Sequence, residues 1–162
     1  LLSKLTQAHP KVAAYPFTTL NPMVGTLEFE SYERLKIADI PGLIDGAHEG
    51  VGLGHHFLRH IERARFLLFV IDMEGGEGRN PLEDFNHLRE ELRLHQESLG
   101  CTPYAVIANK MDAPGAEEHL KEFCAAISAA VYPISAELEE GLEPVLDHLE
   151  AHFFKQGESS SL

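Results

Sequence analysis

Residues 103–112, PYAVIANKMD, join an apolar run to an amide, an ammonium and a carboxylate. Such a continuous apolar run is typical of a strand that is covered on both faces, as in a mostly parallel sheet. Ligands bind such sheets beyond the carboxyl ends of the strands, although a polar turn after a buried strand is equally ordinary. The choice between these two interpretations depends on whether other strands end in matching loops.

Similar apolar runs alternate with helix-like periodic segments along the chain, which predicts an α/β fold with a three-layer, mostly parallel sheet. We expect strands over 24–30, 34–40, 65–72, 103–109 and 130–135, the first two as an antiparallel pair. We expect helices over 1–8, 54–64, 81–98, 116–128 and 141–154. The apolar positions of the third helical segment recur at helical spacing and predict core packing: Leu82, Phe85, Leu88, Leu92 and Leu99.

Composition narrows the class of protein. The 162 residues suffice for one domain with a real core, and no apolar run is long enough to span a bilayer. A formal charge of −13 argues against nucleic acid as a partner, because the surface repels phosphate. Cys101 and Cys124 lack metal spacing, and the apolar surroundings of Cys124 predict a buried thiol. His55, His56 and His60 lie close together in the sequence, but no carboxylate is spaced to complete a set of metal ligands with them. We therefore assign no histidine metal site.

The loops after the predicted strands 103–109 and 130–135 carry groups that match guanine. The two oxygens of Asp112 can accept from N1–H and N2–H₂, donors that adenine lacks in those places. Asn109 can brace the loop or reach the base edge, and the stem of Lys110 can cover the purine face. In the second loop, Ser135-Ala136-Glu137, a small residue allows a backbone N–H to reach guanine O6. The candidate base-binding residues are Asn109, Lys110, Met111, Asp112, Ser135, Ala136 and Glu137.

Two upstream loops have the features of a phosphate and Mg²⁺ site. Asp39 ends a predicted strand, where it can hold a Mg²⁺ water, and Gly42 lets its N–H approach a terminal phosphate. One of the two adjacent threonines at 18 and 19 can ligate Mg²⁺ through its hydroxyl, and the five glycines of 42–54 suit a segment with two conformations. Alone, each short match also fits an ordinary turn. The candidate residues are Phe17, Thr18, Thr19, Leu20, Asp39, Ile40, Pro41 and Gly42, with Asp39 and one of the threonines as candidate metal ligands.

Four short motifs occur in a fixed order, each beside a predicted strand: TT (18–19), DxPG (39–42), NKxD (109–112) and SA (135–136). This combination argues against a chance match. The chain resembles a GTPase of the Obg family, within the Ras-like P-loop GTPases, over residues 1–155. The resemblance rests on PKVAAYPFTTL (10–20), IADIPGLIDGA (37–47) and GLGHHFLRHIERA (52–64). Related DRG and YchF-type GTPases share parts of these motifs, but the intact Asp112 argues against the YchF-like branch. Residues 156–162 are expected to form a disordered tail.

The resemblance implies roles for individual positions. Thr19 matches the switch I Mg²⁺ ligand, 39–42 the switch II phosphate sensor, 109–112 the guanine-binding loop, and 135–136 the second base loop. Leu43 stands where Ras-like proteins carry the glutamine that orients water, so no catalytic residue is assigned. The resemblance implies a slow GTPase, which agrees with the absence of this glutamine. It also implies that a potassium ion or a ribosomal partner supplies the missing catalytic group.

No G-x-x-x-x-G-K-[ST] occurs in the chain, and LLSKLT resembles the helix that follows such a loop. We therefore expect the first strand and the P-loop to be missing, so that the 162 residues alone bind nucleotide weakly or not at all. Loss of a central strand would also expose the pairing edges of its neighbours.

The resemblance implies a Mg²⁺-dependent switch that binds GTP and GDP and acts in large ribosomal subunit assembly. It implies a monomer in the cytoplasm, with bacterial cytosol favoured over a mitochondrion or other organelle. Two alternatives stay open: a truncated, non-catalytic fragment that acts as an interaction module, and an acidic α/β binding domain of unrelated function.

Overall fold

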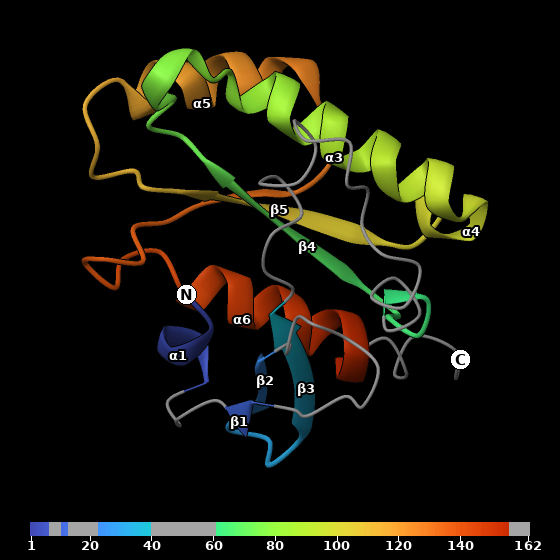
Figure 1. Cartoon of the computed structure of the whole chain (residues 1–162). Coiled ribbons are helices and arrows are strands. Elements are labelled where there is room, and N and C mark those ends of the chain that lie inside the picture. Colours follow the sequence, from blue (N-terminus) through green and yellow to red (C-terminus); the bar gives the residue numbers. More distant parts are fainter. Residues whose placement is uncertain (7–10, 13–22, 40–60, 156–162) are drawn as a thin grey trace, which may run out of the picture.

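The computed structural model describes residues 1–6, 11–12, 23–39 and 61–155, in which strands and helices alternate from residue 67 onward (Figure 1). The strands are β1 (Lys11–Val12), β2 (Met23–Glu28), β3 (Arg34–Asp39), β4 (Leu67–Asp72), β5 (Tyr104–Asn109) and β6 (Val131–Pro133). The helices are α1 (Leu2–Leu5), α3 (Pro81–His95), α4 (Glu97–Gly100), α5 (Ala116–Ala126) and α6 (Glu143–Glu150). A 3-10 turn, η1 (Gly76–Gly78), precedes α3, and a π-helical turn, η2 (Ala151–Lys155), follows α6.

The strands form two sheets. β4, β5 and β6 are parallel, with Asp72 opposite Asn109 where β4 and β5 end. β1, β2 and β3 are antiparallel, which confirms the expected pairing of the two early strands. Because parallel strands end at one edge of their sheet, the loops after β4, β5 and β6 meet at a common rim.

Alternation along β5 places the parallel sheet between two helical layers, so the predicted α/β layering is confirmed (Figure 1). Val106 and Ala108 pack in a cluster with side chains of α3 and α5, whereas Ile107 packs on the other face with α6. All three side chains have no exposed surface. The second cluster also takes in Leu27 of β2, so α6 lies between the two sheets. The two hydrophobic clusters pack on opposite faces of the parallel sheet and so hold the strand ends at the rim in place.

Within the described residues, β3 and β4 each have one edge without a partner strand. Val70 of β4 is 41% exposed, although its neighbours Phe69 and Ile71 are buried. An open edge beside an uncovered apolar side chain is a place where a further strand can pair. The expectation that a central strand of the sheet is missing stays a prediction.

The helix predicted over 81–98 ends earlier than expected. Asn80 caps α3 by accepting from the N–H groups of Leu82 and Glu83 at 2.9 and 3.2 Å, and Pro81 occupies the first turn. Gln96 is extended (φ −152°, ψ 120°), so the single predicted helix is instead α3 and α4. The break turns the chain toward β5 while Leu99 remains buried in the core.

Other predicted boundaries differ by small amounts or lie outside the described residues. The strand expected over 130–135 has only the three residues of β6, and α6 ends at Glu150 because the last turn is π-helical. The predicted helix 54–64 falls mostly outside the described part. Cys124 is exposed, which corrects the predicted buried thiol. It follows the buried Phe123 by one residue, about 100° around α5, and therefore faces away from the core.

Candidate functional site

The loops after β5 and β6 are joined by hydrogen bonds between predicted site residues. The Ala136 N–H donates to Asn109 Oδ1 at 3.1 Å, and the Met111 N–H donates to the Ile134 carbonyl at 3.0 Å. Asn109 therefore braces the second loop, one of the two roles predicted for it. The pairing follows from the parallel register of β5 and β6, which brings their ends together.

Ser135 connects the same two loops through its side chain. Its Oγ donates to Asp112 Oδ1 at 2.6 Å and accepts from the Leu138 N–H at 3.1 Å. Ser135 is 2% exposed, whereas Asp112 is exposed. A buried hydroxyl thus orients an accessible carboxylate, whose second oxygen and remaining lone pairs can accept from a ligand.

The turn after Ser135 is closed by a tight backbone approach. Ser135 and Glu140 exchange N–H···O bonds of 3.1 and 3.0 Å. The next residue, Gly141, has φ +75°, and a Cβ there would lie 2.4 Å from the Pro133 carbonyl oxygen. Glycine is therefore needed at 141 to keep the loop in place.

We expect Gly141→Ala to lower the free energy of unfolding by about 2 kcal/mol or more, since left-handed strain adds to a backbone clash. Gly78→Ala is the matched control, because Gly78 has φ +76° but a Cβ added there would meet nothing within 4 Å. Chemical denaturation of both variants measures the difference. Equal losses would show that the contact with Pro133 does not constrain the loop.

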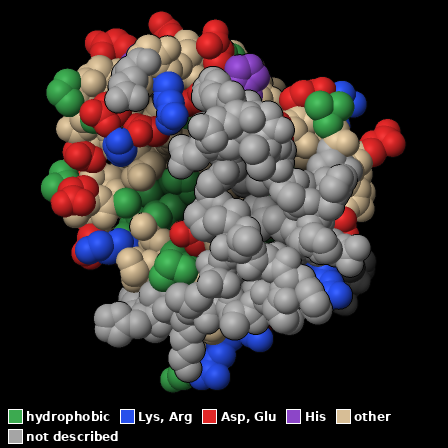
Figure 2. All heavy atoms as spheres, viewed as in Figure 1, with side chains coloured by type: hydrophobic (Ala, Val, Ile, Leu, Met, Phe, Trp, Pro, Cys, Tyr) green, Lys and Arg blue, Asp and Glu red, His purple; other side chains and the backbone are tan. Residues whose placement is uncertain are grey.

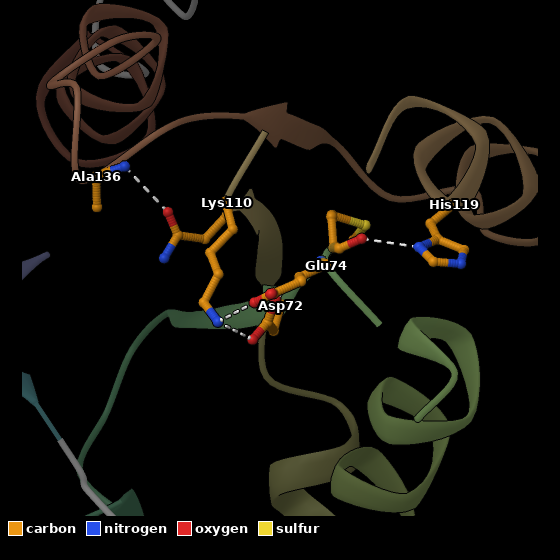
Figure 3. A network of polar contacts seen from close by, with 7 residues as sticks. Asp72, Glu74, Lys110, His119 and Ala136 are labelled. Carbon is orange, nitrogen blue, oxygen red and sulfur yellow. Dashed lines mark hydrogen bonds and ion pairs between the residues drawn. The ribbon is translucent and has the colours of Figure 1, made fainter. Parts of the chain in front are cut away.

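Lys110 reaches from the first loop to the end of β4 (Figure 3). Its Nζ lies 2.7 Å from Asp72 Oδ2 and 2.7 Å from Glu74 Oε2. The hydrogen bond to Asp72, and then that to Glu74, raises the pKa of Lys110 above its ordinary value, so the ammonium stays charged. Sequence reasoning missed Asp72 and Glu74, although the polar ending of the apolar run 65–72 was a signal of the same kind as the others.

A cavity of about 410 Å³ opens at this rim, beside the N-terminal Leu1. It is lined by Leu1, Ser3, Lys4, Asn109, Lys110, Asp112, Ala136 and Glu137. Lys4 forms an ion pair with Glu139 that ties α1 to the second loop. Figure 2 shows basic side chains lying among acidic ones on the viewed face. The cavity therefore joins two carboxylates (Asp112 and Glu137), backbone and amide groups, and two lysines.

Of the remaining predicted residues, the structure describes Met111 and Asp39. Half-buried Met111 packs against the core, so only its backbone takes part in the loop. Asp39 ends β3 as an exposed carboxylate opposite Met23, and its oxygens are of the type that Mg²⁺ prefers. Outside the described residues lie Phe17, Thr18, Thr19, Leu20, Ile40, Pro41 and Gly42.

In the described ranges, no three His, Cys, Asp or Glu side chains are grouped to hold a metal ion. No described helix is both long and apolar enough to cross a membrane.

Solved structures share this fold. The cytosolic domain of L. pneumophila FeoB has a TM-score of 0.61 at 23% identity, covering 91% of this chain and 60% of that one. The G domain of the T. maritima FeoB iron transporter has a TM-score of 0.61 at 20% identity, covering 90% and 84%. At such identities the similarity concerns the fold alone. It shows that this chain has the α/β fold of GTPase G domains.

Sequence comparison defines the family. A model described as "50S ribosome-binding GTPase" matches residues 1–110, and the chain belongs to this family. GTPase Obg of Akkermansia muciniphila is 50% identical over 151 residues, which cover 93% of this chain and 43% of that protein. GTPase Obg of Caldanaerobacter subterraneus is 51% identical over 150 residues, covering 91% and 35%. The resemblance to Obg GTPases is confirmed, and the chain spans less than half the length of these relatives.

Proposed function

We propose that the protein binds guanine nucleotides and hydrolyses GTP to GDP and phosphate with Mg²⁺, as a switch in large ribosomal subunit assembly. The observation that carries the proposal is the hydrogen-bonded pair of loops in which Ser135 and Asn109 hold Asp112 and Ala136 at the rim. Membership of the 50S ribosome-binding GTPase family supports both the nucleotide and the ribosomal partner. The bacterial relatives support a bacterial cytosol as its location.

Base recognition follows from the donors and acceptors at the rim. Asp112 accepts from guanine N1–H and N2–H₂, two donors that adenine does not present together. The Ala136 N–H is the donor for guanine O6. In the structure this N–H is bonded to Asn109 Oδ1, so base binding requires it to be shared or exchanged. The stem of Lys110 covers the purine face.

The phosphate half of the proposed site uses the upstream loops. Thr19 and Asp39 would hold Mg²⁺, which supplies charge neutralisation of the phosphate oxygens when bound. The Gly42 N–H would contact the γ-phosphate. Release of these contacts after hydrolysis would change the conformation of the adjoining loops, which is how such switches work.

Nucleotide titration of the full-length protein that contains this chain tests the proposal. We expect GDP and GTP to bind with Mg²⁺, and ADP and ATP to bind at least about 100-fold more weakly, because the adenine edge leaves Asp112 unpaired. Phosphate release then measures turnover. Equal affinity for adenine and guanine nucleotides would contradict the assignment.

A second candidate is a non-catalytic interaction module formed by residues 1–162 alone. It is favoured by the lack of G-x-x-x-x-G-K-[ST] in these residues, since that motif supplies most β-phosphate contacts. We expect the isolated chain to bind GDP weakly or not at all. Tight, Mg²⁺-dependent binding of GDP by the 162 residues would contradict this expectation.

We expect Ser135→Ala to weaken guanine nucleotide binding several-fold and to lower the free energy of unfolding by about 1 kcal/mol. The change removes the donor that orients Asp112 and leaves the Leu138 N–H without its acceptor. Ser135→Thr, which retains the hydroxyl, is the comparison for fluorescence titration. If Ser135→Ala binds GDP as tightly as the unaltered protein, this hydroxyl does not organise the base site.

A further inference from the structure

The Lys110 ammonium is held by two carboxylates at the neighbouring strand end (Figure 3). We call Asp72 and Glu74 the carboxylate clamp; each has an oxygen 2.7 Å from Lys110 Nζ. The Glu74 N–H donates to Asp72 Oδ1 at 2.9 Å, so one turn presents both side chains. The clamp therefore fixes where the long Lys110 side chain runs.

The turn that carries the clamp is itself anchored on both sides. The buried Met73 donates its N–H to the Asn109 carbonyl at 2.9 Å. Its own carbonyl accepts from His119 Nδ1 of α5 at 2.8 Å (Figure 3). Since these bonds tie the turn to β5 and α5, the clamp holds a constant position relative to Asn109.

Lys110 lies between Asn109 and Asp112 in the chain and lines the same cavity. Its φ of +65° is rare for a side chain of this kind, so the loop is held in one conformation. We propose that Asp72 and Glu74 are positioning residues for guanine nucleotide, which hold Lys110 along the cavity wall so that its stem packs on the purine. This inference rests on the proposed function and adds two residues to it.

Electrostatics gives the clamp a second effect on an anionic ligand. Two carboxylates and one ammonium leave a single net negative charge; loss of Lys110 would leave two, and loss of both carboxylates would leave one positive charge, which by itself favours an anionic ligand. Weaker binding after loss of the clamp would therefore report the position of the Lys110 side chain and not charge repulsion. The side chains of the three residues are 46–48% exposed, so their ion pairs contribute little to folding stability. Changes in the clamp should therefore alter nucleotide affinity much more than the unfolding midpoint.

The test compares three variants and one control variant of the full-length protein by GDP titration and thermal unfolding. We expect Asp72→Asn with Glu74→Gln to weaken GDP binding about 10-fold, which corresponds to about 1.4 kcal/mol. Lys110→Met, which retains an unbranched stem but leaves the carboxylates uncompensated, should weaken it further. Adding both clamp substitutions to Lys110→Met should restore part of that loss. Glu90→Gln with Arg93→Gln, which removes an exposed ion pair of α3, is the control and should bind as the unaltered protein does.

The outcomes separate this inference from the proposed function. If the unaltered protein binds no guanine nucleotide, the proposed function fails and the clamp assignment falls with it. If the unaltered protein binds GDP but the clamp variant binds equally well, the inference alone is overturned. It is also overturned if the triple variant binds no tighter than Lys110→Met, or if affinity falls only in step with the unfolding midpoint.

Discussion

Asp112→Asn is expected to lower guanine nucleotide affinity on the order of 100- to 10,000-fold, through the loss of two charge-assisted hydrogen bonds. Asparagine has the shape of aspartate but offers one acceptor oxygen and one NH₂ donor. Its oxygen can still accept from Ser135, so the loop should remain in place. The guanine N1–H and N2–H₂ would then face a group that satisfies at most one of them. Competition titration with GDP and ADP measures the change.

The same substitution should favour a different base. Xanthine carries an oxygen where guanine has its amino group, so the asparagine NH₂ gains an acceptor. We expect the variant to bind xanthosine diphosphate more tightly than the unaltered protein does. Asp147→Asn, the same exchange on an exposed position of α6, is the control and should leave base preference unchanged. A variant at 112 that kept its preference for GDP over ADP would contradict the base assignment.

Phe85→Ala is expected to reduce the free energy of unfolding by about 3–5 kcal/mol, a large part of the stability of a typical domain. Phe85 is 1% exposed, and its ring meets those of Phe69 and Phe123 at centroid distances of 5.3 and 5.4 Å. Its removal leaves a cavity where α3, α5 and the parallel sheet come together. Urea denaturation measures the loss.

Leu94→Ala on the same helix is the matched control. Leu94 is 71% exposed, so the change should stay within about 0.5 kcal/mol of the unaltered protein. Similar losses for the two variants would show that α3 does not pack on the sheet through Phe85.

The meeting of the loops after β5 and β6 was predictable because it depends on a general property of parallel sheets. Asn109 and Asp112 follow one buried strand and Ser135 and Ala136 follow the next, and strands that run parallel end at one rim. The polar end of the run 65–72 was a signal for Asp72, but no spacing rule connects Asp72 to Lys110, so their contact was not predicted. Their contact arises from the register of β4 and β5 and from the left-handed backbone at Lys110.

Helical periodicity predicted which side chains are buried more reliably than where helices end. Leu92 and Leu99 are both buried, as their spacing predicted, yet the extended Gln96 separates them into two helices. The prediction that Cys124 is buried was wrong because it used only the apolar residues around it in the sequence. On α5, burial depends on the angle of a side chain from the buried Phe123. The division into two sheets was not predicted, because it depends on which strands pair with one another. Strand pairing is a tertiary property, and strand propensities carry no information about it.

A crystal structure of the full-length protein with GDP and Mg²⁺ tests most directly whether the loops after β5 and β6 bind guanine. We predict that Asp112 accepts from N1–H and N2–H₂ at about 2.7–3.2 Å, with the Lys110 stem against the purine face. A base bound elsewhere, or one whose N1 and N2 contact other residues, would contradict the account.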